Sequence, residues 1–99
     1  MRHQIIFSSE ALRHLEFFDV RDQRIILDAL EVQLRHQPAV ETKNRKLRRP
    51  NPLAPWELRI DEIRIYYNIE VLEMPVVNII AIGVKRRDRV FILGEEADA

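Results

Sequence analysis

The first part of the chain combines a short apolar run with apolar residues at helical spacing. Residues 4–7, Gln-Ile-Ile-Phe, are short and β-prone and predict a first strand. Ser8 or Ser9 is a good N-cap for the helix that follows. The apolar residues of this helix lie three and four positions apart, at Ala11, Leu12, Leu15 and Phe18. The pattern therefore predicts a short amphipathic helix after the strand.

A second helix is predicted to begin after Asp19, which can serve as its N-cap. Asp22 then lies near the positive end of the helix dipole. The apolar stripe of this helix consists of Ile26, Leu27, Leu30 and Leu34. Pro38 ends the helix, because proline disfavours helical conformation in the residue before it. The short connection between the two helices predicts that they run antiparallel.

Residues 38–55 interrupt this pattern with a basic, proline-rich loop. The loop holds four of the five prolines, and five of the seven residues at 43–49 are cationic. A connection of this length is long for a compact domain, and such loops are often functional.

After Pro55 the period changes to two, which is typical of half-buried strands. Residues 56–60 and 63–71 alternate between apolar and polar side chains. Residues 76–84 are almost wholly apolar, as expected for a central strand that is buried on both faces. Residues 90–93 predict a last short strand, and an acidic tail at 94–99 closes the chain.

The order of these elements is β-α-α-β-β-β-β and predicts a single α+β domain over residues 1–99. We expect the N-terminal strand and the α-hairpin to pack on a mainly antiparallel sheet of four to five strands.

The composition narrows the class of protein. The chain has 99 residues, of which 46% are hydrophobic and 32% charged, so it can form one folded domain with a modest core. The absence of cysteine excludes disulfides and thiolate chemistry. His3, His14 and His36 are not spaced as metal ligands, and no apolar run is long enough for a membrane span or a signal peptide. We therefore expect a cytoplasmic, soluble domain without metal or cofactor.

The formal net charge is zero, but the charges are unevenly distributed. Residues 1–42 carry 5 basic and 7 acidic side chains, residues 43–89 carry 11 and 6, and residues 90–99 carry 3 acidic ones. The net charges of these segments are therefore −2, +5 and −3. Because fields at moderate salt act within roughly 10 Å, the basic middle matters more to a bound anion than the total charge does.

A two-residue turn at Asp61-Glu62 fixes the register of the predicted hairpin. Arg59 then faces Arg64, and Glu57 faces Tyr66, on the side away from the helices. Two opposed arginines repel unless a carboxylate or a bound anion lies between them. Either Glu57 neutralises the pair on a solvated face, or the arginines form a cradle for phosphate, which the planar guanidinium group suits.

Two further groups of cations could join a phosphate cradle: the loop at 43–49 and the run at 85–89. Each of them is also compatible with a solvated loop or turn. Tyr66 lies on the arginine face and could stack a nucleic-acid base, whereas Trp56 and Tyr67 are expected in the core.

The order and spacing of these short motifs resemble the RelE/ParE superfamily of toxins from bacterial toxin–antitoxin pairs. The similarity covers most of the chain. It is carried by Lys46-Leu47 and by the sequences WELRI at 56–60, RIYY at 64–67 and IAIGVKR at 80–86. The family fold is a small sheet backed by an α-hairpin, which matches the elements derived above.

The resemblance implies a toxin of the mRNA-interferase kind, in which the 2′-hydroxyl of RNA attacks the adjacent phosphate. Arg64 matches the active-site arginine of the family, and Lys85 or Arg86 matches the basic residue at the end of the fourth strand. Phe91 falls where the nucleases often have a catalytic tyrosine, and Glu57 falls where they have a lysine. Glu57 is thus either a catalytic base or an ion-pair partner. The residues expected to bind RNA or phosphate are Lys43, Arg45, Lys46, Arg48, Arg59, Tyr66, Arg87 and Phe91.

Two alternatives follow from the departures at positions 57 and 91. The chain could be a ParE-like toxin that binds DNA gyrase without nuclease chemistry, or a non-toxic protein that only binds its antitoxin. In each case the resemblance implies a cognate antitoxin as partner. Residues 90–93 are short and apolar, and they are either a core strand or an exposed edge that could pair with an antitoxin segment.

Overall fold

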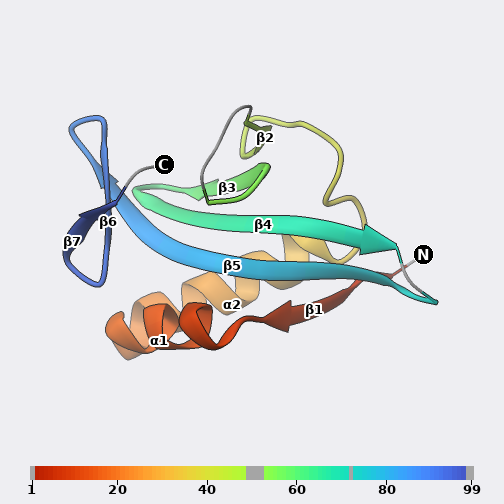
Figure 1. The fold of residues 1–99 in the computed structure, drawn as a ribbon, viewed down its shortest axis with the longest axis horizontal. Coiled ribbons are helices and arrows are strands. Elements are labelled where there is room, and N and C mark those ends of the chain that lie inside the picture. Colours follow the sequence, from red (N-terminus) through yellow and green to blue (C-terminus); the bar gives the residue numbers. More distant parts are fainter. Residues whose placement is uncertain (1, 49–52, 72, 98–99) are drawn as a thin grey trace.

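The computed structural model describes residues 2–48, 53–71 and 73–97. In this part of the chain, two helices cover one face of a seven-stranded, mostly antiparallel sheet (Figure 1). The elements in chain order are β1 (Gln4–Phe7), α1 (Ser9–Phe17), α2 (Val20–Leu34), β2 (Arg45–Leu47), β3 (Trp56–Ile60), β4 (Ile63–Val71), β5 (Pro75–Arg86), β6 (Arg89–Ile92) and β7 (Glu95–Ala97). The expected α+β class is therefore confirmed, and the predicted elements occur in the expected order together with two additional strands.

The sheet is larger than the expected four to five strands. Its strands follow the order β2-β3-β4-β5-β6-β7, and β1 pairs in parallel with β5. The two additional strands are β2, within the proline-rich loop, and β7, within the acidic tail. Arg49, Pro50 and Pro52 of the loop and Asp98 of the tail lie outside the described residues. Because β7 pairs with β6, residues 90–92 are not a sheet edge.

The β3–β4 hairpin has the register that the sequence predicted. Ile60 pairs with Ile63, Arg59 with Arg64, Leu58 with Ile65 and Glu57 with Tyr66. The pairing puts Leu58, Ile65 and Tyr67 on the helix side, where they join a core with residues of both helices such as Ala11 and Ile26. Tyr67 stacks on Trp56 with ring centroids 6.0 Å apart, and its hydroxyl donates to the Pro38 carbonyl at 2.6 Å.

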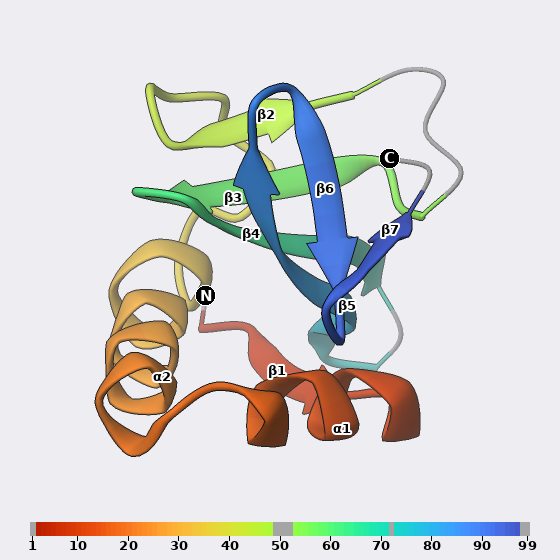
Figure 2. The same ribbon diagram turned by 90° about the vertical axis from the view of Figure 1, so that its left-hand side faces the viewer.

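Both helices begin at the predicted caps. The side chains of Ser8 and Asp19 accept hydrogen bonds from the backbone N–H groups of Ala11 and Asp22. The expected antiparallel arrangement is wrong. Figure 2 shows α1 from the side and α2 closer to end-on, so the two helices cross. Helix α1 packs on β5, whereas α2 lies beside the β3–β4 turn, where Ala29 lines a hollow together with Ile60 and Asp61.

Helix α1 also completes the hydrogen bonding of β5. Residues 80–83 of β5 pair with neither β1 nor β6, and this part of the strand edge faces α1. There Ser8 Oγ donates to the Ile80 carbonyl, and the Ile82 N–H donates to His14 Nδ1, both at 3.2 Å. His14 is consequently a buried structural residue, and burial, followed by the nearby charge of Arg13, lowers its pKa.

The opposite face of the sheet carries a second, smaller apolar cluster. Its buried residues are Ala54, Tyr66, Ala81 and Val90. Strand β6 approaches β5 closely here, because a Cβ atom on Gly83 would lie only 2.7 Å from the Phe91 carbonyl oxygen. This cluster leaves the part of the face over β2, β3 and the start of β4 to charged side chains.

Candidate functional site

Five cationic side chains gather on the sheet face that is turned away from the helices, which we call the outer face. The register places Lys46 opposite Glu57, and Arg59 opposite Arg64, whose other neighbour is Gly83. Lys85 lies two residues beyond Gly83 and shares its face. Arg48 follows β2 and reaches the same face. Lys46, Arg48, Arg59, Arg64 and Lys85 are all half-buried, so they are held by their surroundings and still reach solvent.

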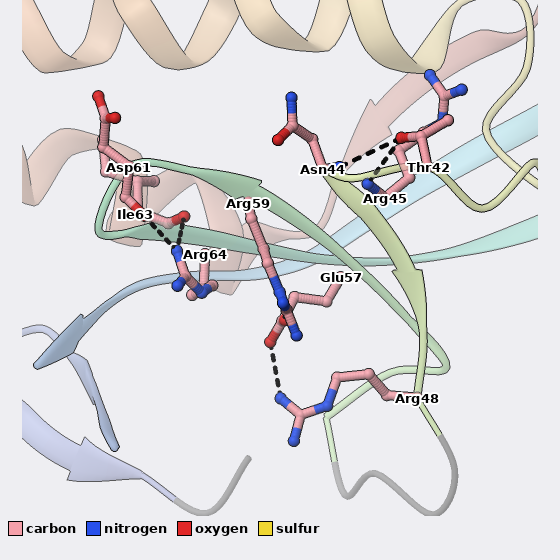
Figure 3. Close-up of polar contacts among 9 residues, drawn as sticks. All are labelled: Thr42, Asn44, Arg45, Arg48, Glu57, Arg59, Asp61, Ile63 and Arg64. Carbon is pink, nitrogen blue, oxygen red and sulfur yellow. Dashed lines mark hydrogen bonds and ion pairs between the residues drawn. The ribbon is translucent and has the colours of Figure 1, made fainter. Parts of the chain in front are cut away.

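A buried carboxylate holds two of these arginines. Arg59 Nε donates to Glu57 Oε1 and Arg48 Nη1 donates to Glu57 Oε2, each at 2.7 Å (Figure 3). Burial raises the pKa of Glu57, but the hydrogen bonds from Arg59 and Arg48 outweigh it, and the net effect lowers the pKa. Glu57 is therefore ionised, and each of its two oxygens already accepts a hydrogen bond from an arginine.

Arg64 is directed away from Arg59, which relieves the repulsion between the two opposed arginines. Its Nη1 donates to the carbonyl oxygens of Asp61 at 2.6 Å and Ile63 at 3.0 Å (Figure 3). Its Nε is buried and has no hydrogen-bond partner among the described residues. The backbone of the β3–β4 turn thus positions this guanidinium group and leaves it without an ion pair to any described carboxylate.

Tyr66 shares the outer face but is fully buried. Its ring lies in the apolar cluster with Ala54, Ala81 and Val90, so it is not available to stack a base in this conformation. Its hydroxyl has no hydrogen-bond partner in the part of the chain that is described. Burial and then the nearby charge of Glu57 raise the pKa of this hydroxyl, so Tyr66 remains protonated at neutral pH.

Arg45 is not part of the outer face. It pairs with Leu58 and points to the helix side, as Figure 3 shows. Its side chain is buried and donates to the Val40 carbonyl at 2.9 Å, to the Gln33 carbonyl at 2.9 Å and to Gln33 Oε1 at 3.0 Å. Its expected contact with RNA does not fit this burial, and Arg45 instead fastens the loop to the end of α2.

Arg86 and Phe91 also lie on the wrong side of the sheet for a common site with Arg64. Phe91 pairs with Val84, and Val84 pairs with Ile63, whose side chain belongs to the helix-side core. Phe91 and Arg86 accordingly line a hollow beside Phe17 and Phe18 of the α1–α2 junction. Of the remaining expected residues, Lys43 and Arg87 are exposed, the first before β2 and the second in the β5–β6 turn.

The geometry defines what the outer face can do chemically. Guanidinium and ammonium groups on a rigid sheet can bind phosphate oxygens and stabilise negative charge that develops on phosphorus. Of the five cations, Arg64 and the two lysines take part in no ion pair within the described residues. Besides the two lysines, the acid–base groups described on this face are Glu57, whose oxygens are occupied, and Tyr66, whose hydroxyl is buried.

Sequence reasoning missed the pairing of Arg48 with Glu57 and the buried roles of Arg45 and His14. The first two depend on strand β2, which was not predicted from the sequence. A strand over residues 45–47 alternates sides, so Lys46 and Arg48 share one face while Arg45 points to the other. His14 lies one turn after Ala11 on the buried side of α1, which predicts burial but not its hydrogen bond to β5.

The fold belongs to the RelE-like class of α+β domains, in which two helices pack on a mostly antiparallel sheet. A chain in the crystal structure of the toxin–antitoxin complex RelBE2 from Mycobacterium tuberculosis has a similar fold, with a TM-score of 0.72. The match covers 86% of this chain and 100% of that chain at 19% sequence identity, so it shows a common fold. No family model and no curated relative matches the chain. Within the described residues, no helix is long and apolar enough to cross a membrane.

Proposed function

We propose that the protein is the toxin of a type II toxin–antitoxin pair and that its outer face binds and cleaves mRNA. The observation that carries this proposal is the set of half-buried cations around Arg64 on one sheet face. The similarity of the fold to a chain of the RelBE2 toxin–antitoxin complex supports it. Because the helix side is occupied by the core, the outer face is where a phosphate backbone finds cationic side chains.

In the proposed reaction the 2′-oxygen of one nucleotide attacks the adjacent phosphorus and the bond to the 5′-oxygen breaks, leaving a 2′,3′-cyclic phosphate. Arg64 and Lys85 stabilise the negative charge that builds up on the phosphate oxygens. Lys46 and Arg48 hold the flanking backbone. Glu57 acts as the ion-pair partner that fixes Arg48 and Arg59, since both of its oxygens already accept arginine hydrogen bonds. The protons then pass between the RNA oxygens and water or groups of the ribosome.

The first test is growth arrest on expression of the chain without an antitoxin. Arg64→Ala removes the guanidinium of the outer face without opening the core, so we expect growth to recover while the purified variant keeps its fold. Arg24→Ala is the matched control, because Arg24 is exposed on α2 and makes no ion pair among the described residues. Full toxicity of the Arg64→Ala variant would contradict the assignment of this site.

A second candidate function is a ParE-like toxin that binds DNA gyrase without any chemistry. The occupied oxygens of Glu57 and the burial of Tyr66 favour it, because neither group is then free to take the proton of an attacking 2′-hydroxyl. DNA supercoiling assays, run in parallel with mRNA analysis of the same cells, separate the two. Loss of gyrase activity with intact mRNA supports this second function, and normal growth with neither effect indicates a chain that only binds its antitoxin.

A further inference from the structure

On the helix side, three neighbouring hollows follow one another along a groove that the RNA proposal does not use. The first lies between the α1–α2 junction and the β5–β6 hairpin, the second beside the start of α2, and the third along α2. Their volumes are about 310, 390 and 400 Å³. The first two share Phe18, Val84 and Arg86, and the last two share Ile60 and Asp61, so each hollow adjoins the next. We call this the helix-side groove.

The groove carries large apolar side chains that are open to solvent. Phe17 is 61% exposed, Val32 76% and Leu93 42%, although all three line the groove. On α2 the residues that face it recur at helical spacing, with Ile25, Ala29 and Val32 in a row. A continuous apolar strip of this kind on a small domain is typical of a surface that another protein covers.

The charges along the groove are mostly negative. Asp22, Asp28 and Asp61 line it, and none of them takes part in an ion pair among the described residues. The two arginines that line it are already paired, Arg59 with Glu57 at 2.7 Å and Arg86 with Glu62 at 3.4 Å. The rim therefore attracts cations and repels phosphate, in contrast to the outer face.

From this combination we propose that the helix-side groove binds a cationic, amphipathic segment of a partner protein. Apolar side chains of the segment would cover Phe17, Ile25 and Val32, and its lysines or arginines would pair with Asp22, Asp28 and Asp61. Figure 2 views the end of the molecule at which the α1–α2 junction lies below the β3–β4 turn. The proposal goes beyond the RNA chemistry, because the groove lies on the helix side and reaches the outer face at its rim, at Arg59.

The test is a selection of binders from a displayed library of random 16-residue peptides against the purified full chain. We expect the selected peptides to combine lysine or arginine with large apolar residues. Their dissociation constants should rise about tenfold on Asp22→Asn, Asp28→Asn and Asp61→Asn combined, because the three substitutions remove the unpaired charges of the rim. Asn suits position 61, where φ is +51°.

Matched variants separate this proposal from other accounts. Glu16→Gln, Glu41→Gln and Glu73→Gln combined remove the same charge at exposed sites outside the groove and should leave the dissociation constant within about twofold. Phe17→Ser with Val32→Ser removes the exposed apolar contacts and should weaken binding without unfolding the chain, which circular dichroism checks. Arg64→Ala, which abolishes the proposed RNA function, should leave peptide binding intact, so the two proposals can fail separately.

Three results would overturn the proposal. Selected peptides that are acidic, and that lose binding on Arg64→Ala, would place recognition on the outer face. Sedimentation that shows a dimer abolished by Phe17→Ser with Val32→Ser would make a second copy of the chain the occupant. A selection that produces no peptide sensitive to the three aspartate substitutions would show that the groove binds no such segment.

Discussion

At the scale of single residues, Glu57 decides how the outer face is interpreted. A carboxylate that is almost fully buried and accepts from both Arg48 and Arg59 acts on its neighbours, because it fixes two guanidinium groups that would otherwise repel each other. The lowered pKa of Glu57 agrees with this role, since a general base at neutral pH is served better by a raised one.

Glu57→Gln tests this role directly. We expect the free energy of unfolding to fall by about 1–3 kcal/mol, because the arginines lose a charged acceptor but remain partly solvated. RNA binding should become tighter, on the order of twofold, because a negative charge leaves the face. Urea denaturation and fluorescence anisotropy with a short RNA measure the two effects. Unchanged stability combined with loss of RNA cleavage would instead show that Glu57 is the base.

His14 makes stability depend on pH near neutrality. Burial holds its folded pKa below the unfolded value of about 6.5, so the unfolded chain binds the proton more readily. The free energy of unfolding therefore falls as the pH drops through about 6.5 toward the folded pKa, because protonation takes the acceptor from the Ile82 N–H. His14→Asn keeps an acceptor near Nδ1 and does not titrate, so denaturation between pH 7.5 and 5.5 should show a smaller loss. Identical pH profiles for both proteins would exclude this contribution of His14.

At the scale of elements, Gly83 allows β6 to cross close to β5. Ala at this position would bring a Cβ atom to 2.7 Å from the Phe91 carbonyl oxygen, so a strand has to move. We expect Gly83→Ala to lower the free energy of unfolding by about 3 kcal/mol. Gly94→Ala is the comparison, because φ is +79° there but the nearest atom is 3.5 Å away, and it should cost about 1 kcal/mol. Equal losses in thermal denaturation would show that β6 is free to shift.

In the short strand β2, two neighbouring cations have different roles: Arg45 is structural, and Lys46 belongs to the proposed RNA-binding face. Arg45 fastens the loop to α2 through Val40 and Gln33, whereas Lys46 is half-buried on the outer face. Arg45→Ala should lower stability by about 1–3 kcal/mol, because the partly buried carbonyls of Val40 and Gln33 lose their donor, and RNA affinity should be unchanged. Lys46→Ala should leave stability unchanged and weaken RNA binding at low salt. If Arg45→Ala weakened RNA binding and Lys46→Ala lowered stability, the register of β2 would be contradicted.

The sequence predicted the parts of this fold that depend on local pattern. Strict alternation and a two-residue turn were sufficient for the pairing of Arg59 with Arg64 and of Glu57 with Tyr66. Strands β2 and β7 have three residues each and are stabilised by neighbours that are distant in sequence, so no local pattern marks them. The crossing of α1 and α2 likewise depends on where α1 meets β5 through Ser8 and His14.

The candidate site was predicted only in part, for a related reason. Four of the cations lie together because alternation along the strands directs their side chains to the same face of the sheet. They are Lys46, Arg59, Arg64 and Lys85. Arg86 and Phe91 were assigned by their resemblance to family positions, and their place in the β5–β6 register puts them on the other face. The side chain of Tyr66 points to the same face but is covered by Ala54 from a loop and by Val90 from β6.

At the scale of the whole molecule, a net charge of zero conceals two surfaces of opposite character. The outer face is cationic around Arg64, and the helix-side groove is apolar with an acidic rim at Asp22, Asp28 and Asp61. Because the groove lies on the helix side, phosphate and a cationic protein segment would bind to different faces. A partner in the groove could therefore be present together with RNA on the outer face.

The central claim is that the outer face cleaves mRNA, and primer extension on mRNA that is translated in a cell-free extract tests it most directly. The account predicts that added wild-type protein creates new RNA ends within the translated region. It also predicts that Arg64→Ala creates none, while Arg24→Ala acts as the wild type does. Intact mRNA with the wild-type protein, under conditions in which the same preparation arrests growth or inhibits gyrase, would contradict the account.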